Sequence, residues 1–174
     1  SRSLTGVLSG DSVSLIDGTA TFADPNVGTW TVTGTGFSLS GTDAGNYSLA
    51  SVGTTNATIT AATTTATLAV TGPVQYSDQS TFTVSLSPDQ ILGVSPATGV
   101  QFKIDGVNVN TVQTLTDSGA SLTASITTPI LLAPGSHLIT ASFEGVNSNF
   151  TVSAATATLL VNQEDARTTY TGLI

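Results

Sequence analysis

The sequence contains no cysteine and no methionine among its 174 residues. Without cysteine, a disulfide framework, a thiolate zinc site and a cysteine nucleophile are all excluded. The absence of both sulfur-containing residues also removes the two side chains that oxidise most readily. This composition suits a long-lived protein outside the cell.

Charge is also scarce, because charged residues make up 8% of the chain against roughly 25% in ordinary globular domains. The only cations are Arg2, Lys103 and Arg167, and eleven acids give a net charge of -8. Binding to nucleic acid or to an anionic membrane requires clustered Lys and Arg, so the sequence excludes both partners. Thr, Ser, Asn and Gln must supply the polar surface.

Long apolar runs are missing as well. No stretch approaches the roughly 18 consecutive apolar residues that indicate a membrane-spanning helix. Ser1-Arg2-Ser3 is not followed by the apolar run of a signal peptide, so a secretion signal is expected upstream of this sequence. Hydrophobic residues still reach 39%, which is enough to form a core.

The pattern that is present has a period of two, with apolar residues alternating with small polar ones. Such runs indicate strands with one buried and one solvated face, and several short strands of this kind indicate an antiparallel sandwich. The clearest runs are residues 13–15, 20–22, 30–32, 82–86, 100–104 and 139–143. The sequence therefore predicts an all-β protein.

Turn signals separate these runs. They are Asp17-Gly18, Asp24-Pro25-Asn26, Gly72-Pro73, Asp105-Gly106, Asp117-Ser118-Gly119 and Pro134-Gly135. No segment has the apolar periodicity of a helix, and the best helical candidate is one short turn around residues 42–46.

A stretch of small residues at positions 57–66 predicts a domain boundary at about residue 62. A similar stretch at 153–161 leads into the last strand of the second domain. The similar endings indicate modules placed end to end.

Three motifs in the first domain carry a family resemblance. They are Gly10-Asp11, Asn26-Val27-Gly28-Thr29 and Asp43-Ala44-Gly45-Asn46-Tyr47. In this order they resemble the YDG domain over residues 1–60. That domain, like the related MBG repeats, recurs in large bacterial surface proteins and adhesins.

The second part of the chain resembles a bacterial Ig-like repeat. The resemblance rests on Tyr76-Ser77-Asp78 before a strand and on Pro134-Gly135-Ser136-His137 before the closing hairpin. It implies a truncated YDG-like β-module at residues 1–62 and an Ig-like sandwich of about seven strands at 63–162.

The resemblance also implies that both ends lie inside modules. The Tyr-Asp-Gly signature is absent, so the first domain is expected to lack its opening strand and to leave an open sheet edge. Residues 163–174 resemble the start of a further repeat. One option is that Thr169–Ile174 adds to the open edge of another copy by strand addition, and the other is a proteolytic or expression boundary.

Candidate sites for chemistry are few. His137 is the only histidine, so a histidine-based triad and a two-histidine metal site are excluded, and His137 is expected to cap the core edge. The acids lie in or near turns, where they bind their own backbone, and no calcium-loop spacing occurs; they are Asp11, Asp17, Asp24 and Asp43. An inter-domain calcium near Asn56 and Asp78 has no support from spacing. We therefore expect no catalytic, cofactor or metal site.

The remaining candidates are interpreted as structural. Trp30 is expected to anchor the first core by packing on Phe22 and Tyr47, because an exposed Trp30 would instead indicate ligand binding. Lys103, the only lysine, alternates with core residues and so points outward, which argues against an isopeptide crosslink.

These features predict a non-enzymatic structural module of an extracellular bacterial surface or secreted repeat protein, forming a stalk or fibre. Its partners would be neighbouring repeats or other copies of itself. The alternative is an adhesin module that binds a host or glycan ligand through loops such as Ser87–Gly99. In that loop Ile91, Leu92 and Val94 are expected to tuck into the sandwich edge rather than form an exposed patch. A third hypothesis is an accessory domain of a hydrolase.

Overall fold

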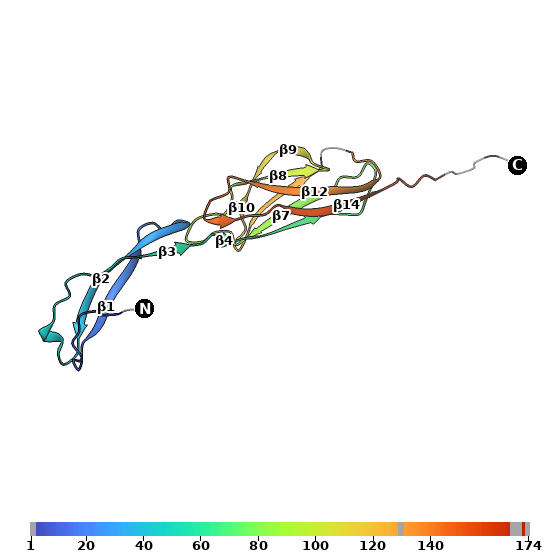
Figure 1. Cartoon of the computed structure of the whole chain (residues 1–174). Coiled ribbons are helices and arrows are strands. Elements are labelled where there is room, and N and C mark those ends of the chain that lie inside the picture. Colours follow the sequence, from blue (N-terminus) through green and yellow to red (C-terminus); the bar gives the residue numbers. More distant parts are fainter. Residues whose placement is uncertain (1–2, 129–130, 168–171, 173–174) are drawn as a thin grey trace. The chain divides into compact units, whose positions relative to one another are not determined.

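Strands account for nearly all of the regular structure, so the all-β prediction is confirmed. The structure is a computed structural model that describes residues 3–128, 131–167 and 172 (Figure 1). Contacts divide the chain into unit 1, Ser1–Thr60, and unit 2, Ala61–Ile174. Among the described residues, no helix has the length and hydrophobicity needed to span a bilayer.

Unit 1 is a three-stranded antiparallel sheet. Its strands are β1 (Ser14–Phe22), β2 (Gly28–Ser40) and β3 (Thr55–Ile59), in that spatial order. The expected helical turn is the 3₁₀ helix η1 (Ala44–Asn46). Strand alternation gives the sheet an apolar face, which includes Trp30 and Val32, and a hydroxyl face. On the hydroxyl face Thr29 pairs with Thr58 across strands at 2.9 Å.

The sequence pattern placed a turn at Asp17-Gly18, and this prediction was wrong. Asp17 (φ 57°) and Gly18 (φ 79°) lie inside β1, and the pairing with β2 continues on both sides of them. Gly36 in β2 is also left-handed (φ 70°). Left-handed residues in both strands make a local irregularity rather than a reversal, and the Phe37 ring lies over Gly18, where a Cβ would overlap it.

Unit 1 has no buried residue among its described positions 3–60. The prediction that Trp30 anchors a closed core was therefore wrong. Trp30 is half-buried, its Nε1 donates to the Asn26 carbonyl, and Phe22 is exposed. Tyr47 lines the same hollow as Leu39, near the other end of β2 from Trp30. The reason is that the apolar face has only partial cover, from residues 3–13 and 47–53.

Unit 2 is built from two sheets and a short parallel pair. The first sheet has the order β10 (Thr116–Asp117), β11 (Leu122–Thr127), β7 (Thr81–Ser87), β5 (Thr65–Val70). The second has the order β6 (Val74–Gln75), β14 (Ala155–Asn162), β12 (Gly135–Glu144), β8 (Gly99–Ile104), β9 (Val107–Thr114). The parallel pair joins β4 (Ala62–Thr63) to β13 (Phe150–Thr151).

This strand order is that of the immunoglobulin fold. Strands β5, β7, β11 and β10 take the A, B, E and D positions, and β14, β12 and β8 take G, F and C. Strand β9 pairs with β8 and is an added C′ strand. After β5 the chain crosses to the second sheet, where β6 pairs in parallel with β14. The two sheets contain nine strands, so the expected Ig-like sandwich is present with more strands than the predicted seven or so.

The core of unit 2 lies between the inner faces of its two sheets. Phe82 of β7 and Phe102 of β8 are fully buried and meet with ring centroids 6.4 Å apart. Fully buried aliphatic residues from both sheets surround them: Val84, Leu86, Val100, Ile139 and Ala141. Alternation along β7 and β12 thus delivers every second side chain to this interior.

We expect Phe102→Ala to lower the free energy of unfolding of unit 2 by about 3–5 kcal/mol, because it removes a buried ring and leaves a cavity. Urea denaturation followed by far-UV circular dichroism measures the change. Fluorescence of Trp30, the only tryptophan, reports on unit 1 in the same sample. The control Thr83→Ala changes the outer face and should cost less than about 1 kcal/mol. Equal losses for the two variants would contradict this account of the core.

Candidate functional site

A corner in unit 1 brings together the first and third YDG-like motifs. The Tyr47 hydroxyl donates to Asp11 Oδ2 at 2.6 Å and accepts the Leu8 N–H at 3.1 Å. Donation to the Asp11 carboxylate is the main cause that raises the pKa of Tyr47. The phenol is therefore held as a hydrogen-bond donor and does not act as a base near neutral pH.

Asp43 closes the same corner from the other side. Its Oδ2 accepts the Ser12 N–H at 2.8 Å, and its own N–H donates to the Ser12 carbonyl at 3.3 Å. The turn of η1 then ends where the Tyr47 N–H binds the Ala44 carbonyl at 3.1 Å. Both acids of the motifs are thus used to hold backbone and hydroxyl groups, which gives these motifs a structural purpose.

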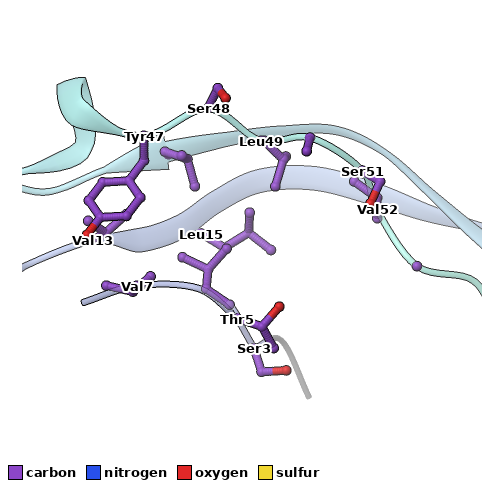
Figure 2. Close-up of a pocket in the computed structure, with 14 residues that line it drawn as sticks. Ser3, Thr5, Val7, Val13, Leu15, Tyr47, Ser48, Leu49, Ser51 and Val52 are labelled. Carbon is purple, nitrogen blue, oxygen red and sulfur yellow. The ribbon is translucent and has the colours of Figure 1, made fainter. Parts of the chain in front are cut away.

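Beside the corner, the apolar face of unit 1 contains a hollow of about 340 Å³ (Figure 2). Leu15 and Leu39 come from β1 and β2, and Leu49 and Val52 come from the segment that follows η1. No residue that lines it is charged, and its lining combines aliphatic side chains with the hydroxyls of Ser3, Thr5, Ser48 and Ser51. Sequence reasoning missed this hollow, because the strand pattern identifies an apolar face without revealing how much of it is covered.

Three other acids accept hydrogen bonds from hydroxyl or backbone groups. Asp17 accepts the Ser38 hydroxyl at 2.7 Å, and Asp24 accepts the Asn26 backbone N–H at 2.7 Å. Asp78 accepts the Gln75 N–H at 3.2 Å beside the last residues of β14. The junction with unit 1 adjoins β4, which pairs with β13 before the first residue of β14. Asp78 therefore lies at the other end of unit 2 from Ala62. Within the described residues, no cluster of three or more potential ligands could hold a metal ion.

His137 lies at the end of the inward face of β12, opposite Leu159. Its Nδ1 is 2.7 Å from Asp105 Oδ2, and its Nε2 is 2.9 Å from the Ala133 carbonyl. Asp105 Oδ1 also accepts the Leu138 N–H at 2.8 Å. The contact with His137, and then the one with Leu138, lowers the pKa of Asp105.

The Ser87–Gly99 loop differs from expectation. Ile91 and Val94 exchange two backbone hydrogen bonds of 3.0 Å and close a two-residue turn. Leu92, at the first turn position, is 99% exposed, and Ile91 and Val94 are also exposed. The prediction that these side chains tuck into the sandwich edge was wrong, because the tight turn projects them from the loop. Lys103 lies on the outer face as expected, opposite Thr140 and Asn108.

Residues 1–56 match the sequence model of the YDG domain family. Among solved structures, the chain is similar to the CARDB domain of a Pyrococcus furiosus protein, crystallised in complex with di-metal ions. The identity is 20%, the match covers 58% of this chain and 94% of that one, and the TM-score is 0.44. A solution NMR structure of the same domain gives 20% identity, 58% and 97% coverage and a TM-score of 0.37. No curated protein matches the sequence.

We expect Gly41→Ala to destabilise unit 1 by about 2 kcal/mol or more, because Gly41 has φ 128° and an added Cβ would overlap the Ser12 carbonyl oxygen. The midpoint of the Trp30 fluorescence transition in urea measures this loss. Gly45→Ala, four residues further on, is the matched control, since its Cβ would meet no atom within 4 Å. Similar midpoints for the two variants would show that the corner does not stabilise unit 1.

Proposed function

We propose that this chain is a structural module of an extracellular bacterial surface or secreted repeat protein, and that it transmits tension along a stalk or fibre. The YDG match over residues 1–56 and the Ig-like strand order of unit 2 support tandem construction. Its partners would be neighbouring repeats of the same chain or other copies of itself.

The observation that carries the proposal is the path of the chain through unit 2. The chain comes in through β4, where the Ala62 N–H binds the Asn149 carbonyl at 2.9 Å beside β13. It goes out after β14, where the Tyr76 N–H binds the Asn162 carbonyl at 2.8 Å. Strand β14 lies between these points and alone extends about 26 Å at roughly 3.3 Å per residue, so the two attachments lie at opposite ends of the sandwich (Figure 1).

The parallel pairing of β6 with β14 determines how this path would resist tension. Val74 pairs with Val161, and Gln75 with Asn162. Tension on the two ends pulls these strands past each other, so their hydrogen bonds are loaded together rather than one after another. Beyond the pair, the Ser77 hydroxyl donates to Glu164 Oε1 at 2.8 Å and extends the attachment.

The outer face of the β10-β11-β7-β5 sheet supports an extracellular setting. Hydroxyls pair across its strands, Thr81 with Thr127 at 3.2 Å and Thr83 with Ser125 at 2.8 Å. Such a surface is polar without being charged, which disfavours binding to nucleic acid and anionic lipid.

Strand addition between copies is part of the proposal. Within the described residues, β1 pairs with β2 alone and leaves its other edge available beside the hollow of unit 1. The donor strand expected at Thr169–Ile174 lies outside the described residues, apart from Gly172.

Single-molecule pulling tests the proposal, and the absence of native cysteine lets introduced cysteines serve as unique handles. Handles at Thr60→Cys and Gln163→Cys load β6 and β14 in shear. Handles at Ser136→Cys and Gln163→Cys peel β14 from β12, because Ser136 pairs with Leu160. We expect a clearly higher unfolding force in the first geometry.

Tyr76→Pro removes the N–H that binds Asn162 and should lower the force in the shear geometry alone. Equal forces in both geometries, or an effect of Tyr76→Pro on both, would argue against a tension-bearing function.

A second candidate, an adhesin module, is favoured by the exposed tip at Leu92. Leu92 (φ 52°) and Gly93 (φ 79°) have the left-handed pair of conformations of a type I′ turn. Leucine is costly in this conformation, where Asn or Gly is usual. An apolar residue that is both strained and fully exposed suggests selection for a contact.

We expect Leu92→Asn to raise the free energy of unfolding of unit 2 by about 1 kcal/mol, because Asn adopts the left-handed turn conformation more readily than Leu. The exposed leucine side chain contributes no buried surface that the substitution would remove. Thermal unfolding measures the gain, with Val107→Asn, also exposed, as control. A loss of stability would contradict the strain argument. If the Leu92→Asn variant binds immobilised host glycoproteins and glycans as well as the wild-type chain does, Leu92 is not a binding residue and the adhesin candidate is contradicted.

A further inference from the structure

We propose that His137 is a proton-controlled latch that joins the Asp105-Gly106 turn to the segment preceding β12. The latch acts at the end of unit 2 where the chain goes out, since Gly135, the first residue of β12, pairs with Val161. It is independent of the tension-bearing function proposed above.

Both ring nitrogens of His137 face hydrogen-bond acceptors. Nδ1 is 2.7 Å from the Asp105 carboxylate, and Nε2 is 2.9 Å from the Ala133 carbonyl. A neutral imidazole carries one N–H, whereas the imidazolium carries two. Only the cation can donate to both acceptors, so both contacts are hydrogen bonds from the ring when His137 is protonated.

Loss of the proton releases one side of the latch. The bond to Asp105 is the stronger of the two because its acceptor is charged, so the neutral ring keeps its hydrogen on Nδ1. The lone pair of Nε2 then faces the Ala133 carbonyl oxygen, and this contact becomes repulsive. The turn stays attached while the segment is freed.

The freed segment is connected to the core of unit 2. Leu132, next to Ala133, packs against the buried cluster between the sheets, whereas Leu131 is exposed. The hydrogen bond to the Ala133 carbonyl therefore keeps Leu132 packed over the end of the core. Weakening it increases the opening of residues 131–135 ahead of global unfolding.

Few other charges face the latch. Among the described residues, His137 and Asp105 form the only ion pair. Residues 131–136 before and within the start of β12, and residues 157–161 on β14, have no ionisable side chain. Lys103 on β8 lies in the row of Thr140, toward the outer face. The titration of the latch therefore belongs to His137 and Asp105.

The signs of the two pKa shifts define a pH window. The Ala133 carbonyl and then Asp105 raise the pKa of His137, so its contribution to stability is complete at low pH and is lost as pH rises through the folded value. The lowered pKa of Asp105 gives a contribution that is present above the ordinary aspartate value, about 3.9, and is lost as pH falls through the folded value. The latch is closed between these limits.

Nuclear magnetic resonance of the full chain tests the latch, because His137 gives the only imidazole signals. We expect a midpoint above about 6.5, both ring nitrogens protonated below it and hydrogen on Nδ1 above it. The contacts of the Leu132 methyl groups with the buried cluster, measured as nuclear Overhauser effects, should weaken across the same midpoint.

Two variants separate the latch from a static contact. His137→Gln can donate but does not titrate, so the pH dependence of the Leu132 contacts should vanish. Asp105→Asn should lower the His137 midpoint. An ordinary midpoint with hydrogen on Nε2, or Leu132 contacts in the wild-type chain that do not change across the titration, would overturn the proposal even if neither variant folds.

Discussion

The contact between two apolar sheet faces is the constraint on which this structure depends. In unit 2 the faces meet at Phe82 and Phe102 and exclude water from the residues between them. In unit 1 one such face exists, and loop segments cover part of it. A single three-stranded sheet gains little from burial, so unit 1 relies more heavily on its hydrogen-bonded corner at Tyr47, Asp11 and Asp43.

The scarcity of charge shapes the outer faces and the turns. Without Lys and Glu to pair across strands, hydroxyls pair instead, as Thr83 does with Ser125. The few acids are placed where the backbone needs an acceptor, as with Asp43 at Ser12 and Asp105 at Leu138. These contacts are uncharged on one side, so they depend less on ionic strength than salt bridges would.

Sequence patterns identified what depends on near neighbours. The period-two runs gave the strands, the Asp105-Gly106 turn closes the β8–β9 hairpin, and the short turn of η1 lies within residues 42–46. The errors arose where distant residues decide the outcome. Asp17-Gly18 continues a strand because Gly36 distorts in the partner strand, and Trp30 stays half-exposed because no second sheet covers it. The partners of His137 come from two loops that no spacing rule connects.

The path of the chain through unit 2 also makes the folded module a store of length. Folded, it separates its attachments by at most about 40 Å, the reach of residues 150–162, while its roughly 100 residues, fully extended, would span about 340 Å. In the proposed stalk or fibre, opening one module would therefore add the length of several folded modules and relieve the load on its neighbours. A row of such units would behave as an extensible tether, whose reach grows in steps.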